Sequence, residues 1–194
     1  MAKFIIAKTL TIKVNNYNFG SPEIQMNIPL SYSLHDLIQI IKISTGYTDN
    51  YDWKFRNPYE ENKNLSLKND SDKIKNISFG KYKSVTPYII CIYGSIELYL
   101  GVRGFVKYRK VYPTIYQAVG KFPTEEEFVK NIEIQDIDGK YTVPMKTLPS
   151  AQHLISDKLI ETGERLKEYF KNRYKISDEI VEGSTFAENK LVRK

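Results

Sequence analysis

The sequence is poor in the residues that most often build metal sites and reactive centres. Its single cysteine, Cys91, can neither form an internal disulfide nor make a zinc site from thiolates. Its two histidines, His35 and His153, both fall in the first turn of an expected helix. There, a partly exposed residue is a better interpretation than a catalytic base. We therefore expect no metal site.

Long apolar runs and signature motifs are missing as well. No apolar stretch approaches the roughly 20 residues that span a bilayer, and the lysine-broken N-terminus is unlike a signal peptide. We expect synthesis in the cytoplasm of a host and no membrane contact. A nucleophile elbow, a phosphate-binding loop and a dinucleotide fingerprint are also absent. We therefore expect neither an enzyme nor a bound cofactor.

The composition is that of a globular protein rich in tyrosine. With 41% hydrophobic and 27% charged residues in a chain of 194, a sizeable core can form. The 15 tyrosines suit half-buried faces and interfaces, because each combines an apolar ring with a polar hydroxyl. The net charge of +6 is modest for a dedicated nucleic-acid binder. Abundant Lys, Asn, Ile and Tyr indicate an AT-rich genome, as in many phages and plasmids.

The N-terminal part predicts a hairpin, a helix and a strand. Apolar and polar residues alternate in Leu10–Val14 and in Ile24–Leu30, which indicates two paired strands with one buried face each. A helix follows as far as Gly46, and Tyr51–Phe55 alternates again. Hairpin, helix and strand in this order predict an α+β fold with a β-grasp-like start.

The helix between the two strand regions has clear end signals. Ser33 is a good N-cap, Asp36 stands three residues later as in a capping box, and Tyr32 with Leu37 occupies the positions of a hydrophobic staple. Gly46 ends the helix. An apolar stripe is expected to face the hairpin and consists of Leu34, Leu37, Ile38 and Ile41.

Further antiparallel hairpins are expected after a polar insertion at residues 57–75, which we interpret as an exposed loop. Tyr88–Tyr93 and Ile96–Val102 predict two strands, and the Gly94-Ser95 pair between them favours a type II′ turn. Gly101–Gly104 has too few glycines to cradle a phosphate and indicates a bulge or bend in the second strand.

The last part of the chain predicts one more hairpin and a long helix. Asp138-Gly139 fits a hairpin turn better than a calcium loop, because the residues after it do not supply alternating oxygen ligands. The acids Glu125–Glu127 follow Thr124 at an expected helix start, where they suit the helix dipole better than catalysis. A long helix is expected over Ala151–Tyr174, and Gly163 within it indicates close packing.

The chain is expected to form an α+β domain over residues 1–148, followed over residues 149–194 by the helix and an extended interaction tail. Spaced apolar residues of the tail include Phe186, Leu191 and Val192. Burying one such side chain contributes ~1.5–3 kcal/mol, whereas ordering each residue of backbone costs ~1–2 kcal/mol. We therefore expect the tail to need a partner surface.

A motif in the first helix resembles the plasmid pRiA4b ORF-3-like family. Members carry an L-H-D-x-I-Q helix, a G-W step and an aromatic strand, and the similar residues here are Leu34 to Gln39, Gly46-Tyr47, Trp53 and Phe55. Weaker similarity to the family's hairpin and P-x-E-D segments lies at Tyr93-Gly94, Ile96, Pro123 and Glu125. The resemblance covers residues 8 to 128. It implies an α+β fold and a mobile-element origin, but no catalytic residue, because the family's hairpin Asp, Trp and His are not reproduced.

One run of the sequence combines basic and aromatic residues without an acid. Such a run can contact nucleic acid through stacking and phosphate pairing, contact a protein, or form a solvated edge strand. These three interpretations stay open, because alternate residues of a strand point to opposite faces and dilute the patch. The candidate contact residues are Arg103, Phe105, Lys107, Tyr108, Arg109, Lys110 and Tyr112.

Among functional classes, we expect a non-enzymatic protein of a phage or mobile element that acts by protein–protein contact. The simplest version is a structural or assembly component of a virion or similar complex, with other protein subunits as partners in a homo-oligomer or hetero-complex. The alternatives are a nucleic-acid-associated accessory or regulatory protein that uses residues 103–112, and an inhibitor that binds a host defence complex.

Overall fold

A computed structural model of the chain describes residues 5–14, 22–60, 64–83, 88–108, 112–119, 122, 124–126 and 156–175. The described strands are β1 (Ile5–Val14), β2 (Glu23–Pro29), β3 (Trp53–Arg56), β4 (Leu65–Ser66), β5 (Tyr88–Tyr93), β6 (Ile96–Tyr108) and β7 (Thr114–Val119). The described helices are α1 (Leu34–Thr45), α2 (Leu67–Asn76), α3 (Phe79–Lys83) and α5 (Ser156–Tyr174).

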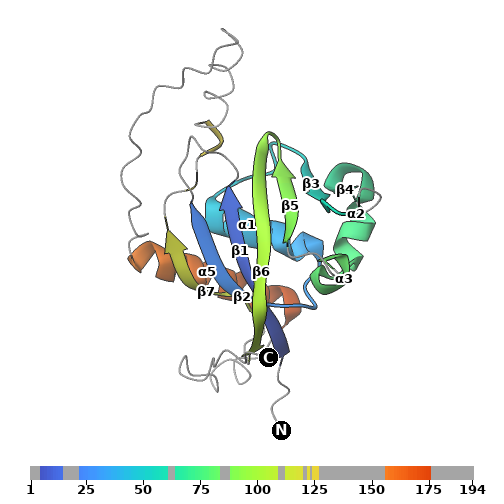
Figure 1. The fold of residues 1–194 in the computed structure, drawn as a ribbon. Coiled ribbons are helices and arrows are strands. Elements are labelled where there is room, and N and C mark those ends of the chain that lie inside the picture. Colours follow the sequence, from blue (N-terminus) through green and yellow to red (C-terminus); the bar gives the residue numbers. More distant parts are fainter. Residues whose placement is uncertain are drawn as a thin grey trace.

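The seven described strands form one sheet in the order β4-β3-β5-β6-β1-β2-β7 (Figure 1). Each pair of neighbours is antiparallel. The predicted α+β class is confirmed, and so is its start: the β1–β2 hairpin, then α1, then β3. Because β5 and β6 lie between β3 and β1, strands from the middle of the chain occupy the centre of the sheet.

The β1–β2 hairpin follows from the alternation of its sequence. Its register pairs Leu10 with Met26 and Ile12 with Ile24, so that apolar residues of both strands share one face. The side chains of Ile12 and Met26 are fully buried, and Ile24 is almost so. The first strand is longer than predicted, because it begins at Ile5 and uses its full length to pair with β6.

Helix α1 has the ends that the sequence predicts. The Ser33 hydroxyl accepts a bond from the Asp36 N–H at 3.2 Å, and the Asp36 carboxylate accepts one from the Ser33 N–H at 2.9 Å, which completes a capping box. Gly46 terminates the helix with φ of 85°, a left-handed conformation that favours glycine. Leu37 and Ile41 are fully buried in the core that α1 forms with the sheet, as predicted.

The predicted hairpin of β5 and β6 is also confirmed. Tyr93 pairs with Ile96 around the Gly94-Ser95 turn. Gly94 has φ of 58° while Ser95 has no positive φ, the sign pattern of a type II′ turn. Along β6, Arg103 pairs with Thr9 and Phe105 pairs with Lys8, so Gly104 is an extra residue. The bulge predicted in this glycine segment is therefore present.

The polar segment 57–75 is not simply an exposed loop, and this prediction was wrong for its second half. Residues 65–76 form β4 and α2, and Ile74 of α2 is fully buried. Asp52 holds this unit, because its carboxylate accepts bonds from the Ser66 hydroxyl at 2.6 Å and from the Lys68 N–H at 3.1 Å. The segment is polar because most of its residues face solvent, while a few apolar ones anchor it.

Helix α5 confirms the long C-terminal helix, and its described part begins at Ser156. Leu166 and Phe170 are fully buried, and the Phe170 ring stacks on Tyr32 with centroids 4.7 Å apart. The close packing expected at Gly163 is absent, since a Cβ there would meet no atom within 4 Å. None of the described helices combines the length and apolarity needed to cross a membrane.

The described helices leave one face of the sheet bare. In Figure 1, α1 and α5 both lie behind the sheet, and no described helix passes in front of β5 and β6. Strand residues that point away from the helices therefore lie on the opposite face of the sheet.

Candidate interaction surface

Strand alternation assigns particular side chains to the helix-free face. On β3, Trp53 and Phe55 are each 1% exposed on the core side, which directs Lys54 and Arg56 to the other side. On β6, buried Leu98 and Leu100 likewise direct their neighbours to that side. We call this region the tyrosine face and define it by Lys54, Arg56, Tyr59, Tyr88, Glu97 and Tyr99.

Three tyrosine rings form a row across the tyrosine face. The ring centroids of Tyr88 and Tyr99 lie 5.5 Å apart, and Tyr59 meets Tyr88 edge-on at 6.3 Å. Tyr59, in the turn after β3, is 64% exposed, whereas the other two rings are half-buried. Rings fixed by their neighbours lose little conformational entropy when they contact a partner, so such a row suits binding.

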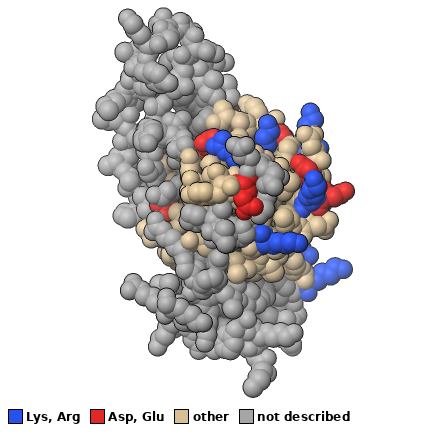
Figure 2. All heavy atoms as spheres, turned by 45° about the vertical axis from the view of Figure 1, so that its right-hand side comes forward, with Lys and Arg blue, Asp and Glu red and all other residues tan. Residues whose placement is uncertain are grey.

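Charges on the tyrosine face are mixed. An Arg56 guanidinium nitrogen donates to the Glu97 carboxylate at 3.0 Å, and both side chains are partly exposed. Lys54 is exposed and lies two residues before Arg56 on β3. In Figure 2, which turns the β3 side of the molecule forward, basic and acidic side chains are interspersed over the described surface. The face therefore carries both signs of charge and a small basic excess.

A buried carboxylate joins α1 to α5. Asp36 is 1% exposed and accepts bonds from the Ser33 N–H and hydroxyl, both at 2.9 Å. From α5, the Tyr174 hydroxyl donates to Asp36 at 2.5 Å, and the Arg173 guanidinium forms an ion pair with it at 2.5 Å. Burial disfavours the charged form of Arg173, but Asp36 together with Tyr174 and Tyr169 outweighs burial and raises the arginine pKa. This cluster attaches the C-terminal helix to the first helix.

The predicted helix residue His35 lies beside this cluster. It is partly exposed, as the sequence predicts. Burial, with the charges of Arg173 and of nearby lysines, lowers the pKa of His35 below its usual value although Asp36 opposes the shift. The imidazole is therefore neutral near pH 7 and sits beside an arginine already paired, an arrangement that provides helix packing.

A second carboxylate joins the loop after α1 to the segment after β7. Glu125 accepts bonds from the Thr48 N–H at 2.7 Å, the Thr48 hydroxyl at 2.8 Å, the Tyr93 hydroxyl at 2.6 Å and the Asn50 amide at 2.8 Å. Burial opposes ionisation of Glu125, but these donors outweigh it and lower its pKa to about 2. With its oxygens occupied by protein donors, Glu125 acts as a structural tie.

Tyr93 is the centre of an aromatic cluster next to that tie. Its ring stacks on Trp53 at 4.4 Å and on Tyr47 at 5.3 Å, and Tyr51 meets it edge-on at 5.4 Å. Burial, and then the bond to Glu125, raise the pKa of the Tyr93 hydroxyl. The buried rings of Tyr47, Trp53 and Tyr93 are therefore core packing for the β3–β5 end of the sheet, and Tyr51 lies at the edge of the cluster with 42% of its surface exposed.

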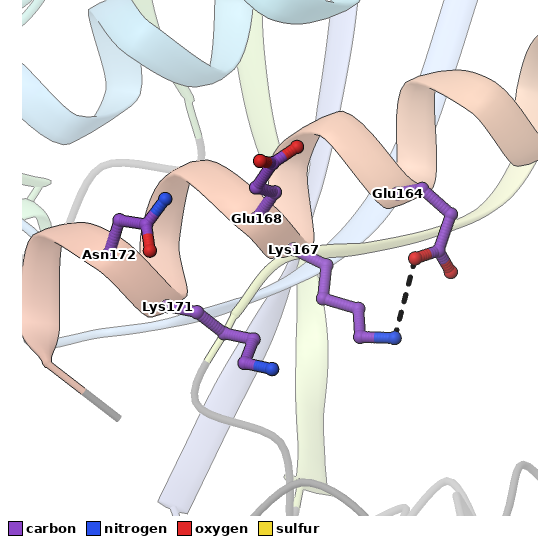
Figure 3. A pocket seen from close by; sticks show the side chains of 5 residues that line it. All are labelled: Glu164, Lys167, Glu168, Lys171 and Asn172. Carbon is purple, nitrogen blue, oxygen red and sulfur yellow. Dashed lines mark hydrogen bonds and ion pairs between the residues drawn. The ribbon is translucent and has the colours of Figure 1, made fainter. Parts of the chain in front are cut away.

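A shallow hollow of about 320 Å³ lies along the outer side of α5 (Figure 3). Its described lining comes from that helix alone: Glu164, Lys167, Glu168, Lys171 and Asn172. Glu164 and Lys167 pair at 3.3 Å, and Figure 3 shows Glu168 directed away from Lys167 and Lys171. These side chains do not converge on a common point. Within the described ranges, no group of His, Cys, Asp and Glu side chains could hold a metal ion.

The contact residues predicted from the sequence are only partly within the described structure. Arg103, Phe105, Lys107 and Tyr108 belong to β6, where the backbone register pairs Lys107 with Ile6 and Tyr108 with Ile5. Tyr112 is 5% exposed, so its ring is buried, although we expected it among the surface contacts. The remaining predicted contacts lie outside the described residues: Arg109, Lys110, Phe186, Leu191 and Val192.

Comparison with known proteins supports the fold alone. No protein-family model matches the chain, and no curated protein sequence matches it significantly. The crystal structure of the protein of unknown function MM3350 from Methanosarcina mazei Go1 is similar, with a TM-score of 0.52 and 12% sequence identity. The similarity covers 84% of this chain and 92% of that one. This chain thus shares an α+β architecture with that protein.

Proposed function

We propose that the protein acts by contact with another protein, without catalysis, and that the tyrosine face is the contact surface. The observation that carries this proposal is the row of Tyr59, Tyr88 and Tyr99 beside the Arg56–Glu97 ion pair. Tyrosine and arginine are enriched at protein interfaces, where a ring contributes area and a hydroxyl or guanidinium contributes hydrogen bonds.

The charge of the face favours a protein over a nucleic acid as the partner. A nucleic-acid groove needs several cations that are free to neutralise phosphates. Here, the defining residues of the face supply only two cations, and one of them, Arg56, already pairs with Glu97. Nucleic-acid contact through residues 103–112 is the second candidate, supported by the four basic residues of that run and the net charge of +6.

A finer version of the proposal concerns the biological setting. Two features support an origin in a phage or another mobile element. The amino-acid composition is typical of an AT-rich genome, and the first helix resembles that of the pRiA4b ORF-3-like family. In that setting the protein would be a subunit of a virion or similar assembly, or an inhibitor of a host defence complex. The apolar residues of the tail would supply a second contact.

The test is site-specific photo-cross-linking in cells that naturally carry the gene. The photoreactive residue p-benzoylphenylalanine replaces Tyr59 in one variant and Ile160 in a matched control, since both side chains are 64% exposed and Ile160 lies on α5. We expect adducts from position 59 that protease removes and nuclease does not. Adducts sensitive to nuclease would instead establish the second candidate.

The control decides whether the surface is specific. If position 160 gives the same protein adducts as position 59, the cross-links report random collision and the tyrosine face is not the contact surface. The absence of adducts from both positions would also count against the proposal, because an interface that excludes water brings the Tyr59 position within reach of a partner.

A further inference from the structure

We infer that the tyrosine face takes an acidic segment of a partner protein, with Lys54 as the receiving cation. The inference rests on the proposed function and specifies its partner. Lys54 is the only lysine among the defining residues of the face, and it is exposed. Among the described residues no carboxylate pairs with it. The same holds for the exposed Lys81 on α3, which therefore differs from Lys54 only in its position.

Arg56 adds capacity for a second carboxylate. One terminal nitrogen of its guanidinium bonds to Glu97, and a guanidinium carries five N–H donors in a planar fork. Its side chain is 43% exposed, so the remaining donors can reach a partner. Because Lys54 and Arg56 are two residues apart on β3, both project from the same side of the strand. They present two cationic heads to one approaching segment.

The tyrosines supply the uncharged part of the contact. Tyr88 lies on β5, the strand that pairs with β3, and Tyr99 lies on the next strand, β6, two residues after the ion-pair partner Glu97. A segment lying on the face would pack apolar atoms on the rings while its carboxylates meet Lys54 and Arg56. The hydroxyls of Tyr59 and Tyr88 can donate to backbone carbonyls of such a segment.

Charge also discriminates between three conceivable partners for the tyrosine face: a second copy of the chain, a nucleic acid and an acidic protein segment. A second copy of the chain carries the same net charge of +6, so two copies repel as they approach. A nucleic acid carries a phosphate on every nucleotide, whereas a peptide can place an uncharged residue beside Glu97. An acidic protein segment therefore fits both the overall charge of the chain and the mixed charges of the face.

The experiment measures fluorescence anisotropy of labelled probes with the full chain at low salt. The probes are a glutamate-rich peptide and a single-stranded oligo-dT of equal total charge. Lys54→Glu is compared with Lys81→Glu, which makes the same charge change at an exposed lysine on α3. We expect the peptide to bind tighter than oligo-dT, and Lys54→Glu to weaken it roughly tenfold, against less than about twofold for Lys81→Glu.

Each other outcome overturns the inference in a recognisable way. Equal effects of Lys54→Glu and Lys81→Glu would show attraction by net charge alone. Tighter binding of oligo-dT would assign the face to nucleic acid, and a dimer in sedimentation that Lys54→Glu dissolves would assign it to a second copy. If the peptide fails to bind while position 59 still cross-links protein, the acidic partner is wrong and the proposed function stands. Circular dichroism of both variants confirms that each is folded.

Discussion

At the scale of single residues, Asp36 has a second role besides the helix cap that its position in the sequence predicts. A capping box needs only Ser33 and the acid three residues later. In the structure the same carboxylate also receives Arg173 and Tyr174 from the far end of the chain. Because it is 1% exposed, the loss of any of these partners leaves polar atoms without water.

Asp36→Ala is therefore expected to destabilise the protein by about 2–4 kcal/mol, since it removes a cap and leaves the Arg173 charge without its partner. The free energy of unfolding from urea titration measures this. Asp49→Ala is the control, because Asp49 pairs with Lys42 at the surface with 67% of its side chain exposed. Asp49→Ala should lower the free energy of unfolding by less than about 1 kcal/mol. Equal costs would contradict the role of Asp36 as a buried tie.

The Glu125 tie predicts a dependence of stability on pH. The pKa of Glu125 falls from 4.5 to about 2 on folding, so the ionised carboxylate stabilises the fold above about pH 4.5. That contribution is lost as the pH falls through the folded pKa. We expect Glu125→Gln to cost roughly 1–2 kcal/mol near neutral pH, because it removes a charged acceptor from several donors.

Urea titrations of the wild type and of Glu125→Gln across the acid range provide the measurement. The difference in unfolding free energy should shrink as the pH falls from 4.5 towards the folded pKa of about 2. The neighbouring Glu126 is exposed, so Glu126→Gln should show no such trend. A constant difference for Glu125→Gln at all pH values would mean that the charge of the carboxylate is not what stabilises the tie.

At the scale of elements, two glycines in helical settings should respond to alanine in opposite ways. In α5, Gly163 has open space around its Cβ position, so Gly163→Ala is expected to stabilise the protein by about 1 kcal/mol through helix propensity. Gly46, at the end of α1, has equally open space but φ of 85°, so Gly46→Ala should cost about 1 kcal/mol. We expect the melting temperature to rise for Gly163→Ala and to fall for Gly46→Ala.

Local signals explain which elements the sequence predicts well. The α1 boundaries follow from Ser33, Asp36 and Gly46, all within a turn of the helix ends. The β5–β6 turn follows from Gly94 because a dipeptide turn is specified by its own residues. In contrast, α2 was missed because only Ile74 of it is fully buried and its anchor, Asp52, lies before β3 in the sequence. A non-local anchor leaves no periodic pattern to find.

The candidate surface was missed for a related reason. Tyr88 is followed by buried Ile89, and Tyr99 lies between buried Leu98 and Leu100, so strand parity was a usable signal for two rings on the same face away from the core. Tyr59 carried no such signal, because it reaches Tyr88 only through the pairing of β3 with β5. The basic-aromatic run drew attention by composition alone, and its Tyr112 is in fact buried.

At the scale of the whole molecule, the position of the Asp36 cluster predicts where the chain can be shortened. Ending the chain after Lys175 keeps Arg173 and Tyr174, so the melting temperature should change by less than about 2 °C, although partner binding through the tail should be lost. Ending it after Lys171 removes both residues and should lower the melting temperature by roughly 5–10 °C. Calorimetry on the two truncations tests this, and equal melting temperatures would contradict it.

The bond between Tyr174 and Asp36 spans 138 positions of the sequence, and this has a consequence during synthesis on the ribosome. The first helix leaves the exit tunnel long before the residues of α5 that bind its Asp36 are translated. Strand β1 waits in the same way for β6, its neighbour in the finished sheet. Until β6 and α5 have emerged, the nascent chain therefore carries an uncovered apolar stripe on α1. We expect the newborn chain to depend on chaperones more than its size alone suggests.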